Sequence, residues 1–203
     1  MPKPQIIHIH GGNAFDSREQ YLAYIKKYYE PLKVRKRWYE SLKSSLWESV
    51  DVYLPKMPAK DNADYDAWAI AFEKVFRFLS DGPVILIGNS LGTVFLTKYL
   101  SENTIPKQIQ SLHLVALVFD GEGIADESMA NFLIDPEKLP HVSEQVSSIH
   151  LYHSRDDRVC PWHNVEKYMS HFSDATLHEF SDRWHFTQEE FPELIEQLKK
   201  EIS

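Results

Sequence analysis

Short apolar segments alternate along the chain with longer segments whose apolar residues recur every three or four positions. The short segments predict strands buried in a sheet, because they are rich in apolar and β-branched residues and lack helical spacing. The expected strands are residues 5–10, 49–54, 84–87, 111–119, 148–153 and 175–180.

The longer segments have the periodicity of amphipathic helices. The clearest lies at 65–79, where Trp68, Phe72 and Val75 are spaced for burial on one face. Ser17 suits the N-cap of an earlier helix, which Pro31 interrupts or ends. The expected helices are 17–31, 37–47, 65–79, one that begins near Thr93, 164–172 and 188–202.

This alternation of strands and helices predicts an α/β fold with a mostly parallel central sheet and helices on both faces. Without repeats or linkers, residues 1–203 suit a single domain. Within it we expect a long helical segment at about 17–48 and a short, irregular, cap-like segment at about 120–147. Ligands of such sheets bind at the carboxyl ends of strands, so residues just after strands are the informative ones.

Strand 84–87 runs into Gly88-Asn-Ser90-Leu-Gly92 and then into a helical segment. Strand, G-x-S-x-G turn and helix together are typical of a nucleophile elbow, which exposes a serine hydroxyl beside a helix N-terminus. An ordinary strand–helix turn that uses glycines for packing is the alternative.

A serine nucleophile needs a base, and the base needs a carboxylate that orients it. Asp157 follows strand 148–153, and His185 follows the last strand, so Ser90, Asp157 and His185 have the chain order known for this kind of elbow. Asp157 can instead cap the turn before Pro161. His178, within the last strand, is the second choice for the base, and His163 and His171 are poorer ones.

The developing oxyanion needs N–H donors. The backbone amide of Leu91, the residue after the serine, is one candidate, and the loop after the first strand supplies the other. Gly12 is the preferred residue in that loop, with Gly11 or Asn13 as alternatives. A tight turn without a chemical role also explains the two glycines.

With His10-Gly11-Gly12, G-x-S-x-G, Asp157-Arg-Val-Cys-Pro161 and Trp184-His185 in these places, the chain resembles the α/β-hydrolases over nearly its whole length. Its small size is similar to that of the compact serine hydrolases of the retinoblastoma-binding-protein 9 type and of the small carboxylesterases. The resemblance implies ester, thioester or amide hydrolysis through an acyl-serine, with no metal and no cofactor. Segment 19–47 looks longer than the compact family needs and suits a pocket wall, whereas the segment after Phe119 is too short for a large lid.

Composition and charge narrow the function classes. With 30 acidic against 22 basic side chains the net charge is −8, which argues against a nucleic-acid partner. No apolar run is long enough to span a membrane, and residues 1–5 lack a signal peptide's apolar stretch, so we expect a cytoplasmic protein. The single cysteine, Cys160, excludes an intrachain disulfide and suits a small buried residue. The oligomeric state is open.

Three further features have two interpretations each. His8 and His10 lie two apart on a strand, as a metal pair would, but a third ligand is missing and His10 fits the oxyanion loop instead. The basic run 33–37 suits a solvated face, or a rim that attracts anionic substrates. Four aromatic residues suit either the core or an acyl pocket: Trp38, Tyr39, Trp162 and Trp184.

The leading hypothesis is therefore a metal-independent serine hydrolase that acts on a small carboxylic ester or thioester. The alternative from another class is a non-catalytic binding or protein-interaction module on the same scaffold.

Overall fold

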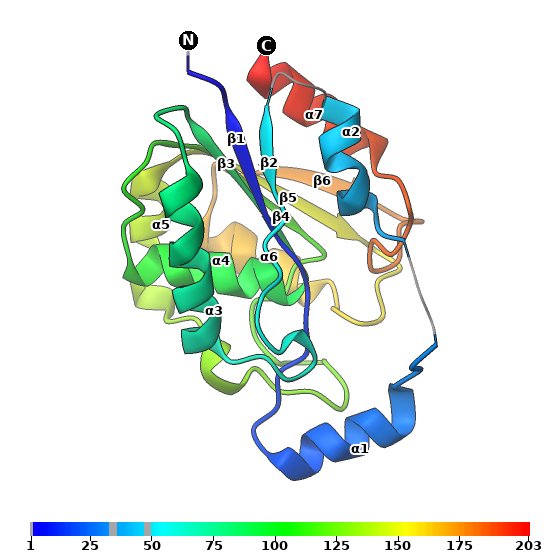
Figure 1. Cartoon of the computed structure of the whole chain (residues 1–203). Helices are drawn as coiled ribbons and strands as arrows, with labels where there is room; N and C mark the ends of the chain where they lie inside the picture. The colour runs from blue at the N-terminus through cyan, green and yellow to red at the C-terminus, as the bar shows by residue number, and fades with distance from the viewer. Residues whose placement is uncertain (1, 33–35, 47–49) are drawn as a thin grey trace.

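The computed structural model of the chain describes residues 2–32, 36–46 and 50–203 (Figure 1). Six strands form one sheet in the order β2-β1-β3-β4-β5-β6, and every neighbouring pair is parallel. The α/β class is confirmed, and the described sheet is wholly rather than mostly parallel. The strands are β1 (Gln5–Ile9), β2 (Asp51–Tyr53), β3 (Val84–Asn89), β4 (Ile109–Val115), β5 (Val146–Ser154) and β6 (Thr176–Phe180).

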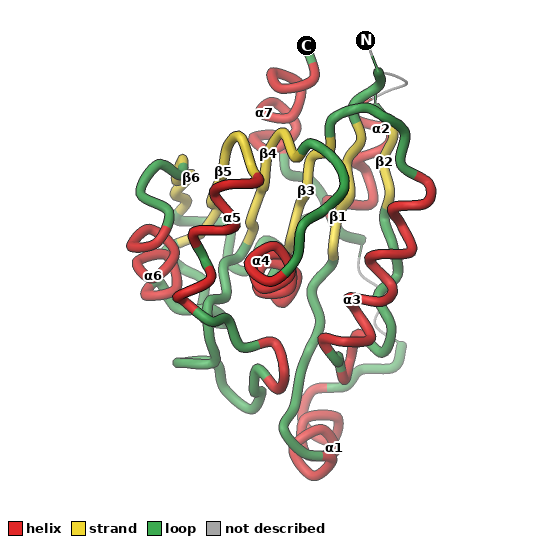
Figure 2. Tube along the Cα trace, turned by 90° about the vertical axis from the view of Figure 1, so that its left-hand side faces the viewer, coloured by secondary structure: helices red, strands yellow, loops and turns green. Residues whose placement is uncertain are grey.

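Helices cover both faces of this sheet, as the alternation predicts (Figures 1 and 2). One face packs against α3 (Tyr65–Glu73), α4 (Leu91–Glu102), α5 (Pro140–Gln145) and α6 (His163–His171). The other packs against α2 (Leu42–Leu46) and α7 (Pro192–Ile202). Alternate strand residues supply the two cores: Ile7 and Leu86 face the α4 side, whereas Ile6 and Ile85 face the α7 side.

β4 ends at Val115, four residues before the predicted end of this strand. Ala116 has a φ of 54°, which turns the chain out of the sheet direction. The next three amides donate to side chains instead of to a neighbouring strand: Leu117 N to His153, Val118 N to Thr93 and Phe119 N to Asn164. Those buried amides are therefore satisfied without a strand, which the apolar pattern could not show.

Segment 17–48 contains α1 (Arg18–Tyr28), the 3₁₀ turn η1 (Trp38–Ser41) and α2, while residues 33–35 and 47–48 lie outside the described ones. Ser17 caps α1 as predicted, accepting from the amide of Gln20. α1 buries no residue and lies beyond the carboxyl ends of the strands (Figure 1). Lys27 and Tyr28 both bind Asp126, which ties α1 to the cap-like segment.

Two other helix predictions need correction at their ends. The α-helical part of 65–79 stops at Glu73 and continues as the 3₁₀ helix η4 (Lys74–Phe78). The closing helix begins at Pro192 rather than at residue 188, in keeping with the preference of proline for the first turn. Segment 120–147 contains the short helices η5 (Ala130–Phe132), η6 (Pro136–Lys138) and α5, and β5 begins near its end, at Val146.

Candidate active site

Ser90 stands at the sharp turn between β3 and α4, with φ 54° and ψ −121°. Its amide donates to the carbonyl of Val115, and the Thr93 hydroxyl donates to the Ser90 carbonyl, so the strained turn is held from both sides. The neighbouring backbone also explains the glycine at position 92, because a Cβ there would lie 2.3 Å from the carbonyl oxygen of Ile9. The predicted strand, elbow and helix are therefore all present.

Three predicted side chains from three separate loops meet here. The distance from Ser90 Oγ to His185 Nε2 is 3.0 Å, and that from His185 Nδ1 to Asp157 Oδ2 is 2.8 Å. The Asp157 carboxylate is fully buried, and its other oxygen accepts the amides of Val159 and Cys160. An acceptor at Nδ1 favours the tautomer whose proton is on Nδ1, which leaves the Nε2 lone pair directed at the serine hydroxyl.

Asp156, the neighbour of Asp157, holds the loop that carries His185. Asp156 Oδ1 accepts the Ser154 hydroxyl at 2.5 Å and the Trp184 amide at 2.9 Å. The hydrogen bond from Ser154 lowers the pKa of Asp156, which keeps this carboxylate ionised as an acceptor. Trp184 and Phe186 both have φ of 49°, so His185 lies between two residues in the left-handed region. The D-D dipeptide is visible in the sequence, but this role for its first residue is not.

His153 holds the other side of the acid loop. Its Nδ1 accepts the Leu117 amide, so its proton is on Nε2, which donates to the Cys160 carbonyl. Burial lowers the pKa of His153 and favours this neutral form. Sequence reasoning missed this residue because a histidine inside an apolar strand indicates only burial.

The loop after β1 lies against the serine. His10 Nδ1 donates to the Gly11 carbonyl, and His10 Nε2 accepts the Met57 amide. The Asn13 amide donates to the Lys60 carbonyl and is thereby engaged. Gly11 and Gly12 remain the candidates for the oxyanion donor in this loop, and a Cβ on Gly11 would lie 3.0 Å from Ser90 Cβ. Leu91, the other expected donor, begins α4, where the first amides lack intrahelical acceptors.

A pocket of about 500 Å³ opens over these residues. Tyr24 of α1, Arg37 and Tyr39 belong to its wall, so segment 17–48 does contribute to the pocket. The lining is mixed, with somewhat more polar than apolar surface, and it includes Glu127, whose pKa is raised because the carboxyl is buried. The remaining lining includes Gly12, Lys60, Asp61, Ser128, Met129 and Trp184.

Several alternatives from the sequence lie elsewhere. His178 contacts His150 and stacks on Tyr152, away from Ser90. His8 packs on Tyr39, whereas His10 packs on Trp68, so the two histidines considered as a metal pair face two different ways. In the basic run, Arg37 lines the pocket, Lys36 is exposed, and 33–35 are outside the described residues.

Of the four aromatic residues considered for an acyl pocket, Tyr39 and Trp184 line it. Trp38 is buried in the core, and Trp162 stacks under the guanidinium of Arg155.

Asp157, Cys160 and His185 bring potential metal ligands within 4.8 Å of one another. The hydrogen bonds above already engage Asp157 and His185. Burial also raises the pKa of the Cys160 thiol well above its usual value, so this cysteine is protonated and is neither a good ligand nor a good nucleophile. Its burial agrees with the sequence prediction.

The sequence model of a family described as serine hydrolase matches residues 33–200. The chain belongs to the serine hydrolase family. The match begins after α1, so β1 and the glycine loop lie outside it. The rat (Rattus norvegicus) serine hydrolase RBBP9 is 28% identical over 123 residues, which cover 61% of this chain and 63% of that protein, less than two thirds of its length.

The fold of this serine hydrolase is similar to that of several solved structures. The ydeN gene product of B. subtilis superposes with a TM-score of 0.74 at 18% identity, over 98% of both chains. A thioesterase domain from the curacin biosynthetic pathway matches with a TM-score of 0.60 at 12% identity, over 99% of this chain and 91% of that chain. The esterase EaEST of Exiguobacterium antarcticum matches with a TM-score of 0.58 at 16% identity, over 98% of this chain and 91% of that chain. These likenesses confirm the expected fold. Among the described residues, no helix combines the length and apolar character that a membrane crossing needs.

Proposed function

We propose that this serine hydrolase cleaves a small carboxylic ester or thioester through an acyl-enzyme on Ser90. His185 Nε2 accepts the hydroxyl proton as Ser90 Oγ attacks the carbonyl carbon, and the same nitrogen then donates that proton to the departing alcohol or thiol. A water molecule, deprotonated by His185, hydrolyses the acyl-serine and restores the hydroxyl. Asp157 holds the imidazole and stabilises its protonated form. The chemistry requires no metal.

The observation that carries the proposal is the continuous hydrogen-bonded chain from Ser90 through His185 to Asp157. Backbone amides of Gly12 and Leu91 are the proposed oxyanion donors, with Gly11 as the alternative to Gly12. Each such donor is typically worth about 3 kcal/mol of transition-state stabilisation. A small substrate is supported by the pocket of about 500 Å³ and its partly polar lining, and the esterase and thioesterase among the structural neighbours support these two substrate classes.

The test compares Ser90→Ala with Ser128→Ala, because both serines line the same pocket. Short-chain p-nitrophenyl esters and acyl thioesters serve as substrates, and a fluorophosphonate probe reports the nucleophile. We expect Ser90→Ala to abolish turnover and labelling, and Ser128→Ala to retain both. Full turnover by Ser90→Ala, or a label on any other residue, would contradict the mechanism.

A protein-binding role through segment 19–47 is the second candidate. It is favoured by α1, which buries none of its residues and leaves Leu22 and Tyr28 close to half exposed, as is Tyr29 directly after the helix. A pull-down that survives Ser90→Ala and fails when α1 is deleted would support this role, and the opposite pattern would exclude it.

A further inference from the structure

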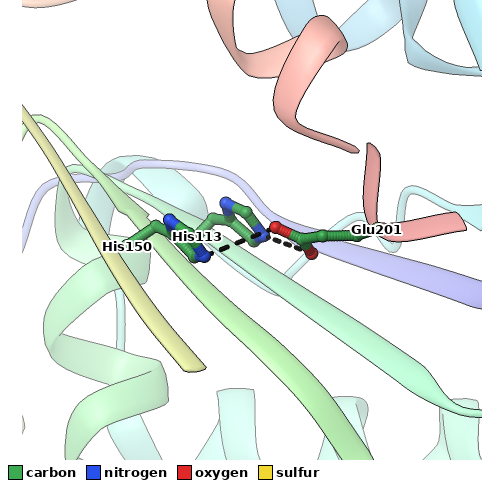
Figure 3. A group of neighbouring side chains, drawn as sticks. All are labelled: His113, His150 and Glu201. Atoms are coloured by element: carbon green, nitrogen blue, oxygen red, sulfur yellow. Dashed lines mark hydrogen bonds and ion pairs between the residues drawn. The ribbon is translucent and has the colours of Figure 1, made fainter. Parts of the chain in front are cut away.

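A second cluster of polar side chains lies between the sheet and α7. His113 on β4 and His150 on β5 are direct neighbours in the strand register, and Glu201 reaches them from the last turn of α7 (Figure 3). The two imidazole rings stack with centroids 4.7 Å apart. Neither histidine nor Glu201 lines the pocket at Ser90, and the proposed hydrolysis uses none of them.

The potential ligand atoms lie close together. His113 Nε2 lies 3.2 Å from Glu201 Oε2, and His150 Nε2 lies 3.4 Å from Glu201 Oε1. Two ligand atoms bound to one tetrahedral zinc ion at 2.0–2.1 Å are about 3.3 Å apart. Each nitrogen is therefore near this ligand–ligand distance from one oxygen of the carboxylate, His113 from Oε2 and His150 from Oε1. All three groups offer a ligand atom within a span of 4.8 Å.

The outer partners of both imidazoles suit metal ligation. His113 Nδ1 lies 3.1 Å from the Tyr152 hydroxyl, and His150 Nδ1 lies 3.2 Å from His178 Nε2. In this structure His113 Nε2 donates to Glu201. An ion bound at Nε2 would replace that proton, and each ring would then donate from Nδ1 to its outer partner, which is the usual arrangement around metal-binding histidines.

Glu201 is oriented by its own neighbours. The Ser111 hydroxyl donates to Oε2 at 2.5 Å, and the Gln197 amide donates to Oε1 at 2.7 Å. Hydrogen bonds from His113, Ser111 and Gln197 outweigh burial and lower the pKa of Glu201 to about 2. Burial lowers the pKa of His150 to about 4.

A third cluster of potential metal ligands, Asp120, Glu122 and His163, differs from the cluster at Glu201 because a lysine is bound to it. The ammonium of Lys167 lies 2.7 Å from the Asp120 carboxylate and 2.6 Å from that of Glu122. Its positive charge already occupies the position that a cation would take. No lysine or arginine has a described contact with Glu201, His113 or His150.

We propose that His113 Nε2, His150 Nε2 and one carboxylate oxygen of Glu201 bind a divalent first-row transition ion of the zinc type. Two imidazoles and one carboxylate are a common zinc ligand set, which leaves a fourth position for water. Because the rings are parallel, an ion between them lies out of both ring planes, so binding turns at least one imidazole about its χ2 torsion and changes the hydrogen bond at Nδ1 of that ring. The ion joins the last turn of α7 to β4 and β5, and its role is to stabilise the fold.

The test uses the full chain after EDTA treatment and dialysis, with Zn²⁺ added and binding followed by calorimetry. We expect one ion per chain and, at a hundredfold excess over the dissociation constant, a rise in Tm of about 5–10 °C. Glu201→Gln and His150→Gln should each weaken binding at least tenfold. The matched control is His141→Gln, because His141 also contacts a carboxylate, that of Glu144, but lies on the surface.

No stoichiometric binding by the unaltered protein would overturn the proposal, as would unchanged affinity in both variants or loss of binding in the control. Should a variant fail to fold, X-ray absorption of the zinc-loaded natural protein decides the matter. Two imidazoles with further oxygen ligands are expected there, and a sulfur ligand or fewer imidazoles would refute the site. Ester turnover by Glu201→Gln should persist, which separates this test from that of the proposed hydrolase.

Discussion

The backbone of Ser90 predicts a trade-off between activity and stability. At φ 54° and ψ −121° a residue with a Cβ is in a sparsely populated region that glycine adopts readily. Replacing Ser90 by glycine should therefore abolish hydrolysis and at the same time stabilise the fold. Ser90→Ala is the matched comparison, because it also loses the hydroxyl and its hydrogen bond to His185 but keeps the Cβ and its strain.

The magnitude follows from two opposing contributions. Strain at such a position costs about 1–3 kcal/mol in the folded state. Glycine relieves this strain but also lowers stability by about 0.5–1 kcal/mol, because it increases the conformational entropy of the unfolded chain. The net difference between Ser90→Gly and Ser90→Ala is thus about 1 kcal/mol in favour of glycine. For a chain of 203 residues this corresponds to a Tm difference of about 2–4 °C.

Urea unfolding of the two variants, followed by tryptophan fluorescence and by far-UV circular dichroism, measures this difference directly. Equal m-values would show that the two unfolding reactions expose the same surface. If Ser90→Gly were no more stable than Ser90→Ala, the elbow would store no strain, and the argument from its dihedral angles would be wrong.

Three other perturbations test the surroundings of the site and the core. Asp157→Asn should lower kcat by about 10⁴-fold, because an amide can hold the wrong imidazole tautomer; steady-state ester kinetics measure this, and a loss below tenfold would contradict the role. Asp156→Ala should lower kcat by about 10²-fold with little change in KM, since it frees the Trp184 amide and displaces the histidine loop; an unchanged kcat would show that the loop holds itself. Burial lowers the pKa of His8 to about 3, below its unfolded value near 6.5. The contribution of neutral His8 to the stability of the fold is therefore complete above pH 6.5 and is lost as the pH falls toward 3. By pH 5 that loss is about 2 kcal/mol of unfolding free energy. Urea titrations at pH 8 and pH 5 should show that the natural protein loses this much more stability than His8→Leu does. Equal losses in the natural protein and in His8→Leu would refute the role of His8.

The features that the sequence predicts well are those that a few neighbouring residues determine. The elbow is one: the β-branched run before Gly88 and the helical spacing after Ser90 are local, and they define both flanks of the turn. The positions of Asp157 and His185 after two later strands are equally local, and a parallel sheet brings all such strand ends to one edge. Their meeting therefore follows once the alternation of strands and helices has been recognised.

The features that remained hidden depend on partners distant in sequence. The end of β4 at Val115 is one. The apolar residues that follow it resemble a strand in sequence, but the backbone amides of residues 117–119 donate to side chains of Thr93, His153 and Asn164. The contact that holds α1 is another: its segment is predicted to form a pocket wall, but the sequence does not show that Lys27 ties this helix to Asp126. Neither the salt bridge to α1 nor the side-chain acceptors after β4 produce a hydrophobic periodicity that the sequence would show.

The two adjacent aspartates show how much the folded geometry adds to residue type. By sequence they differ only in their spacing from Pro161, yet Asp157 binds the His185 ring while Asp156 binds the amide of Trp184, one residue earlier. One carboxylate fixes the orientation of the imidazole and the other fixes the path of the backbone that carries it. Since Trp184 itself has a left-handed backbone, this loop needs both restraints to hold Nε2 at the serine. The nucleophile and the base thus share one physical requirement: each depends on strained backbone that hydrogen bonds from neighbouring strand ends hold in place.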